Sequence, residues 1–210
     1  MRPQLARGQA AMHKTAPTHV IRRAFVASLL GAASALASAQ TIELAGVKFE
    51  PQAQVAGQAL VLNGAAIRYK AIFKVYAIGL YLPAKTASAK EITESNAPRR
   101  VHVVMLREVG GSELGRNFTE HFGDNVTPDE FRSCIPQVFR FGELFSGRKS
   151  MKAGDSFTLE WVPGKGTLIY INGVLQGEPY EGATFFSGML KLWVGDKDSA
   201  GVRAALLGKK

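Results

Sequence analysis

The sequence predicts an α+β domain in which a large antiparallel β-sheet carries a layer of helices on one face. The first observation is the order of the hydrophobic patterns. Strand-like alternation up to residue 106 is followed by helical periodicity over 112–146, by alternation again from residue 156, and by two final helices. The second is that several strand-like segments are joined by short turns with glycine, which are typical of antiparallel neighbours. At 210 residues, the chain suits one domain with a substantial core.

The first 39 residues have the pattern of a cleavable signal peptide. A basic region ends at Arg22-Arg23, an apolar run follows over 24–36, and Ala37-Ser38-Ala39 has the small-x-small form of a signal-peptidase site. We therefore expect cleavage after Ala39, a mature domain of residues 40–210 and a periplasmic location. No later run is long and apolar enough to cross a membrane once the signal is removed.

Two features of this segment leave alternatives open. The basic region is long, so translation starts at either Met1 or Met12. Arg22-Arg23 partly matches a twin-arginine signal, but no Ser or Thr precedes the pair, which favours the general secretory route. An uncleaved anchor is the alternative to a cleaved signal.

The net charge of +9 does not indicate a nucleic-acid partner. Residues 1–39 contain five basic residues and no acid, so the remainder carries +4 (9 minus 5). In that remainder, basic and acidic residues are interspersed, whereas a phosphate-binding surface needs clustered cations.

The strands predicted in the first half lie on either side of one conspicuous arginine. Residues 41–44 and 47–49 form a short hairpin, 58–63 and 65–69 are separated near Gly64, and 72–82 is a long apolar strand. Alternation places Tyr76 on one face of that last strand, with Ile78 and Leu80. Arg68 interrupts this apolar stretch, and a guanidinium is rarely buried without a partner. A short helix over 86–94 and a strand over 99–106 follow.

Two helices are predicted next. Ser112 caps the first, in which Leu114, Phe118 and Phe122 recur every four residues. Thr127 and Glu130 form a capping box for the second, and Pro136 kinks or divides it. The apolar residues of the second helix are Phe131, Cys134, Ile135, Val138, Phe139 and Leu144.

The C-terminal part returns to strands and ends in helices. Strands over 156–162 and 167–171 alternate, and Asn172-Gly173 is a strong hairpin signal before a further short strand over 174–177. A helix over 182–194 contains several aromatic residues, and Asp198 or Ser199 caps a final helix that ends near Gly208.

Common catalytic and cofactor motifs do not occur in the chain. Cys134 is its only cysteine and reads as a buried apolar residue, while the histidines have no metal-ligand spacing. There is no phosphate-binding glycine loop and no GxSxG nucleophile motif. We expect neither a metal nor a cofactor.

The segments GAAIR (Gly64 to Arg68) and FKVYAIGLYL (Phe73 to Leu82) resemble the chalcone isomerase family, and the order of the later elements extends the resemblance over most of residues 47–207. The resemblance implies an open-faced β-sandwich with a cleft between sheet and helices. Some family members close a chalcone to a flavanone, and others bind fatty acids. In both groups the arginine at the position of Arg68 faces an anion, which is a phenolate or a carboxylate.

Differences from the isomerases bear on activity. The position of Tyr76 is typically Thr in isomerases and Tyr in fatty-acid binders. The helix near Ser112 carries a Tyr and an Asn in isomerases, where this chain has Leu114 and His121. His121 is either a substitute base or an ordinary helix histidine, and Ser187 aligns with a polar position on the last helix pair.

Three hypotheses follow from the resemblance and the residues together. The first is a binding protein that holds an apolar carboxylate through Arg68 and Tyr76, with His121 and Ser187 as further candidates. The second is an isomerase, or intramolecular lyase, that uses Arg68 and Tyr76 on a phenolic ligand. The third is a structural or interaction protein in which Arg68 ties backbone carbonyls together.

Overall fold

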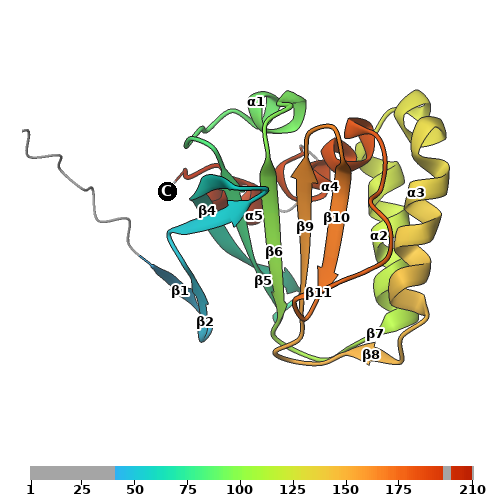
Figure 1. The fold of residues 1–210 in the computed structure, drawn as a ribbon. Coiled ribbons are helices and arrows are strands. Elements are labelled where there is room, and N and C mark those ends of the chain that lie inside the picture. Colours follow the sequence, from blue (N-terminus) through green and yellow to red (C-terminus); the bar gives the residue numbers. More distant parts are fainter. Residues whose placement is uncertain (1–40, 196–199, 210) are drawn as a thin grey trace, which may run out of the picture. The chain divides into compact units, whose positions relative to one another are not determined.

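A seven-stranded antiparallel sheet forms the centre of the domain (Figure 1). The computed structural model describes residues 41–195 and 200–209, so the predicted signal peptide and the predicted caps Asp198 and Ser199 lie outside the described residues. The strand order is β11-β10-β9-β6-β5-β4-β3. These strands are β3 (Gln52–Val55), β4 (Gln58–Lys70), β5 (Phe73–Leu82), β6 (Arg99–Met105), β9 (Ser156–Val162), β10 (Gly166–Ile171) and β11 (Val174–Leu175).

Most of the helices cover one face of this sheet. They are α1 (Ala89–Glu94), α2 (Gly111–Asn125), α3 (Pro128–Ser146), α4 (Ala183–Val194) and α5 (Ala200–Leu206). The main core lies between them and the sheet, and includes Ile78 and Leu80 of β5 together with Phe118, Phe141 and Phe185 of the helices. The prediction of an α+β domain with a large antiparallel sheet and a helical layer is confirmed.

A second, smaller core lies on the other face of the sheet. The hairpin of β1 (Ile42–Leu44) and β2 (Val47–Phe49) supplies Phe49, which packs with Leu60, Ala77 and Tyr81. Gly79 leaves room for it, because a Cβ at Gly79 would come within 2.5 Å of the Phe49 ring. Another small sheet, of β7 (Val109–Gly110) and β8 (Ser150–Met151), joins the segment before α2 to the segment after α3. The open-faced sandwich that the resemblance implied is therefore present.

The strand break predicted near Gly64 is wrong, because β4 runs through it. The register slips between Leu62 and Gly64, and the extra residue, Asn63, turns its side chain to the backbone of Thr86 and Leu206. Gly64 serves a close approach instead of a turn, since a Cβ there would lie 2.0 Å from the Ala205 carbonyl oxygen.

The helix predictions were right in position and partly wrong in detail. The capping box of Thr127 and Glu130 is confirmed. Ser112 is not a cap, since α2 begins at Gly111 after Gly110 without a side-chain cap. Pro136 does not divide α3, which continues past it as Val138, Phe141 and Phe145 anchor the next turns in the core.

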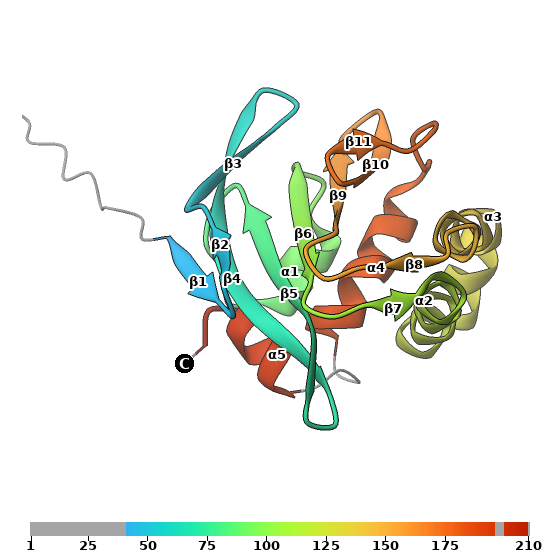
Figure 2. The same cartoon turned by 90° about the horizontal axis from the view of Figure 1, so that it is seen from below.

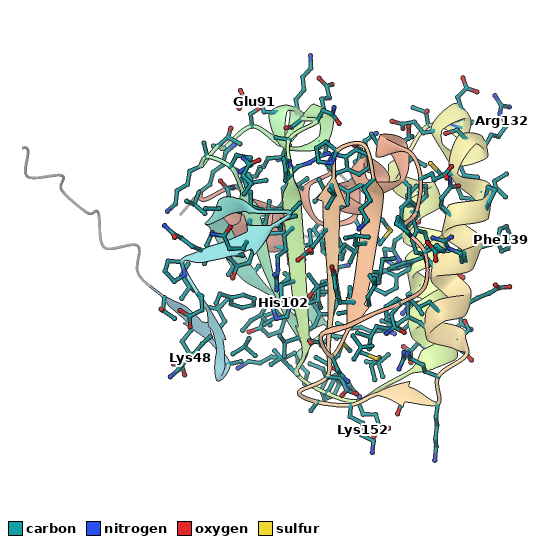
Figure 3. The ribbon with its side chains drawn as sticks, in the orientation of Figure 1. Lys48, Glu91, His102, Arg132, Phe139 and Lys152 are labelled. Atoms are coloured by element: carbon teal, nitrogen blue, oxygen red, sulfur yellow. The ribbon has the colours of Figure 1, made fainter. Side chains whose placement is uncertain are left out.

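Two residues assigned to the apolar side of α3 lie outside the core. Ile135 and Phe139 follow the buried Cys134 and Val138 by one position, about 100° around the helix, and so leave the buried stripe. Phe139 is 59% exposed and points outward from α3 (Figure 3). The predicted helical period is correct, and the predicted apolar stripe is too wide.

Candidate ligand-binding site

A cavity of about 620 Å³ lies between one end of the β4–β5 pair and helices α2 and α4. Arg68, Tyr76 and His121, three of the four residues predicted for a site, all line it. They come from β4, β5 and α2, so the fold brings together side chains that are separate in sequence.

Arg68 and Tyr76 stand directly opposite each other on the paired strands β4 and β5. Opposed residues of an antiparallel pair project from the same face, with Cβ atoms about 5 Å apart. That face is the helix side, because Tyr76 belongs to the main core with Ile78 and Leu80, as the alternation predicted. Arg68 is half-buried, and its charge acts on the Tyr76 phenol.

The Tyr76 hydroxyl is held by Trp193 of α4. The indole Nε1 donates a hydrogen bond to this oxygen over 2.9 Å, and both side chains are buried. Burial raises the pKa of the Tyr76 phenol, although the Trp193 bond and the Arg68 charge act in the opposite direction. Tyr76 is therefore a neutral phenol at neutral pH, and it keeps its own hydrogen to donate.

Apolar side chains form much of the remaining wall. Leu114 and Phe118 lie one turn apart on α2 and so face the cavity together, while Leu192 precedes Trp193 on α4. Leu114 stands where the resemblance places a tyrosine in the isomerases, and it brings no hydroxyl to the cavity.

Charged residues line the outer part of the cavity. Lys70 Nζ lies 3.1 Å from Glu113 Oε1, and since the lysine side chain is largely and the glutamate side chain partly in solvent, the pair contributes little stability. The Arg107 guanidinium lies 5.1 Å from the centre of the Phe73 ring. Glu108 and Glu113 also line the cavity, but Arg68, Lys70 and Arg107 leave its charge positive on balance, beside aromatic surface.

His121 lies on the exposed side of α2, where it still lines the cavity. Its Nδ1 lies 2.7 Å from the Asn117 carbonyl oxygen, and a carbonyl accepts only, so Nδ1 carries the hydrogen. In the neutral ring, Nε2 is then the nitrogen left to accept a bond.

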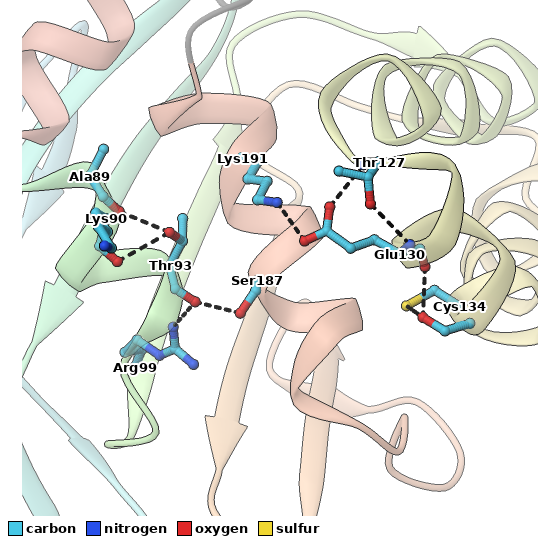
Figure 4. A network of polar contacts seen from close by, with 10 residues as sticks. Ala89, Lys90, Thr93, Arg99, Thr127, Glu130, Cys134, Ser187 and Lys191 are labelled. Carbon is cyan, nitrogen blue, oxygen red and sulfur yellow. Dashed lines mark hydrogen bonds and ion pairs between the residues drawn. The ribbon is translucent and has the colours of Figure 1, made fainter.

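Ser187 lies elsewhere. Its hydroxyl donates to the Thr93 carbonyl oxygen over 2.5 Å, which joins α4 to the end of α1, and it does not line the cavity (Figure 4). The same carbonyl accepts a bond from the buried Arg99. In the structure, Ser187 is part of a contact between helices.

Sequence reasoning missed Trp193 as a site residue and did not single out Lys70, Arg107 or Glu113. Trp193 is 117 positions from Tyr76, and no local pattern joins them. The only signal was chemical, since a buried tyrosine hydroxyl needs a partner.

A metal-type cluster and a membrane-spanning helix are both absent from the described residues. Within residues 41–195 and 200–209, no group of three or more His, Cys, Asp or Glu side chains lies close enough together to hold a metal ion. Helices in those same ranges are each too short or too polar to cross a bilayer.

Comparisons with known proteins agree with the fold. The family model of chalcone isomerase-like proteins matches residues 40–208. No curated protein sequence matches the chain. The crystal structure of the fatty-acid-binding protein AtFAP1 of Arabidopsis thaliana matches with a TM-score of 0.65 at 15% identity, over 80% of this chain and 96% of that chain. This likeness shows a shared fold, and because the family model spans most of the sequence, the chain belongs to the chalcone isomerase-like family.

Proposed function

We propose that the protein binds an apolar carboxylate, fatty-acid-like in its chemistry, with the head group at Arg68 and Tyr76. The observation that carries this proposal is a cation and a neutral phenol side by side in a cavity with an apolar wall. A carboxylate accepts hydrogen bonds from both groups, and the wall of Leu114, Phe118 and Leu192 suits an alkyl chain.

The expected energies favour such a ligand. A charge-assisted hydrogen bond from Arg68 contributes about 1.5 to 3 kcal/mol. Each buried methylene adds about 0.8 kcal/mol, so a long chain contributes more than the head group. The name of the structural relative AtFAP1 describes a fatty-acid binder, which supports the same class of ligand.

A ring-closing isomerase would use the same pair of residues on a phenolic ligand. Leu114 disfavours this alternative, because an apolar side chain cannot donate to a developing oxyanion.

We also propose that the protein acts in the periplasm after cleavage behind Ala39. The mass of the mature protein purified from an exporting host tests this, and a chain that retains residues 1–39 would contradict it.

Binding is tested by native mass spectrometry of residues 40–210 after delipidation and addition of palmitate. We expect a one-to-one complex that Arg68→Ala weakens by about tenfold or more, which is the loss of one charge-assisted bond. Arg116→Ala is the matched control, since Arg116 is an exposed α2 arginine that does not line the cavity.

Two results would contradict the proposal. One is a wild-type protein that neither carries palmitate nor gains thermal stability from it. The other is turnover of a chalcone that is lost in Arg68→Ala, which would establish the isomerase instead.

A further inference from the structure

The turn between β4 and β5 exposes apolar side chains that pack in neither hydrophobic core. Ile72 is 84% exposed, Phe73 57% and Tyr69 48%. Lys70 pairs with Phe73 across the strands, so Ala71 and Ile72 form the tip, where Ala71 adopts φ of 53°. In Figure 2 this tip extends past the neighbouring elements at the lower edge of the view. The exposure follows from position at a projecting turn.

Basic residues surround this tip. Lys70 and Lys74 are exposed on its two strands, and Arg107 lies over the Phe73 ring. Lys70 has Glu113 as a partner, but among the described residues no carboxylate lies within ion-pair distance of Lys74 or Arg107. The surface thus combines apolar side chains with positive charge that acids on the same surface do not fully neutralise.

The tip is also continuous with the cavity. Tyr69, Ala71 and Phe73 line the cavity, as do Lys70 and Arg107, whereas Ile72 and Lys74 do not line it. A surface that contacts the tip therefore lies next to the outer part of the cavity.

We propose that the tip formed by Tyr69, Ile72 and Phe73 docks on an anionic phospholipid bilayer, with Lys70, Lys74 and Arg107 against the lipid phosphates. Apolar and aromatic side chains enter the interface between head groups and acyl chains, and lysine stems reach back to the charged surface. Each basic residue near an anionic bilayer strengthens binding by about fivefold. Docking needs no ligand in the cavity. That docking serves the uptake of a lipid-derived carboxylate rests on the proposed function.

A bilayer fits this surface better than a folded protein does. A specific protein interface takes roughly 20 to 30 residues from each side, which a single turn cannot supply. A narrow apolar tip ringed by cations matches a soft, negatively charged surface, where a few side chains insert between lipids. The charge and the shape of the tip together therefore favour an anionic bilayer as its partner.

Vesicle co-sedimentation tests the proposal on residues 40–210, which lie within the compact unit Ser38–Lys210. The probes are vesicles of phosphatidylcholine alone and vesicles with added phosphatidylglycerol, at low and high salt. We expect binding to the anionic vesicles only, weakened by salt. Ile72→Asn and Lys74→Glu each weaken the apparent affinity for the anionic vesicles by about tenfold, which is seen as a smaller bound fraction.

Matched controls come from other turns and strands. Val174→Asn removes a 63% exposed aliphatic residue on β11, and Lys165→Glu reverses a charge in the turn between β9 and β10. Neither change lowers binding. Because Ile72 and Lys74 do not line the cavity, their variants keep palmitate binding. Arg68→Ala weakens palmitate binding and still docks, because it leaves the tip residues unchanged.

Several outcomes would overturn the docking proposal without touching the proposed function. These are wild-type protein that ignores anionic vesicles, equal binding to neutral vesicles, and controls that weaken binding as much as Ile72→Asn does. A dimer in sedimentation velocity that Ile72→Asn dissociates would assign the tip to self-association instead.

Discussion

Trp193 Nε1 donates to the Tyr76 hydroxyl across 2.9 Å inside the core, and this bond connects helix α4 to the strand that carries the cavity's phenol. Tyr76, which pairs with Arg68 across the two strands, is therefore held by a residue that is itself part of the cavity wall. Since both side chains are almost fully buried, removing either polar group leaves the other without its protein partner.

We expect Trp193→Phe and Tyr76→Phe each to destabilise the fold, by about 1 to 3 kcal/mol, because each leaves a buried polar group unpaired. The double variant loses less than the sum of the two, since it removes both polar groups together. Urea unfolding of the four proteins measures this difference. Strictly additive losses would show that the bond contributes nothing.

The pKa of His102 gives a pH prediction. Burial, with a smaller effect of the Arg100 charge, lowers the pKa of His102 from 6.5 to about 4. The unfolded chain binds this proton more readily than the folded protein does. The stability linked to His102 is therefore fully present above pH 6.5, where the ring is neutral in both states. That stability is lost as the pH falls from 6.5 to about 4, up to about 3 kcal/mol.

The variant His102→Gln tests this effect, because its side chain can still bond with Thr158, whose hydroxyl lies 2.8 Å from His102 Nδ1. Unfolding free energies of both proteins are measured between pH 4 and 7. We expect the wild type to lose more stability on acidification than the variant does. Parallel curves would mean that His102 titrates alike in the folded and unfolded states.

Gly64 permits the contact of α5 with β4, so Gly64→Ala is expected to destabilise the fold by more than 2 kcal/mol, on the order of other overpacked sites. The clash is with backbone, since the added Cβ would lie 2.0 Å from the Ala205 carbonyl oxygen, and backbone cannot move aside as a side chain can. Gly201→Ala, where nothing lies within 4 Å of the added Cβ, is the control. Thermal unfolding of both variants decides whether α5 is held this closely.

Cys134 offers a chemical measure of the α3 packing. Burial raises the pKa of its thiol, and the side chain lies in the main core. We expect iodoacetamide to modify native Cys134 on the order of a hundred times more slowly than the urea-unfolded chain, since it needs an exposed thiolate. Mass spectrometry over a time course measures this, and equal rates would contradict the placement of Cys134 in the core.

Much of the fold could be predicted because its signals are local. The capping box at Thr127 and the turn at Asn172-Gly173 each lie within four residues, and both occur in the structure. Asn172 and Gly173 adopt φ of 51° and 78°, the left-handed values that this dipeptide favours. The alternation that put Tyr76 with Ile78 and Leu80 is likewise a property of one strand.

What the sequence did not show depends on contacts between distant segments. The sequence predicts a strand break near Gly64, although the lack of a side chain there admits α5, which begins more than a hundred residues later. Phe49 over Gly79 and Trp193 beside Tyr76 are similar cases. For the site, Arg68, Tyr76 and His121 share a cavity, while Ser187 contacts Thr93; the binding roles proposed for the first three stay predictions.

The strand order also has a consequence for how the chain folds. Most neighbours in the main sheet are consecutive strands that close over a turn, but β6 pairs with β9 after the whole α2–α3 segment. Loop closure costs more entropy for longer loops, and non-local pairings slow folding. One wall of the cavity, α2, lies inside this loop, and another, the β4–β5 pair, precedes it. We therefore expect the pairing of β6 with β9, which closes the sheet around the α2–α3 segment, to be a late step of folding.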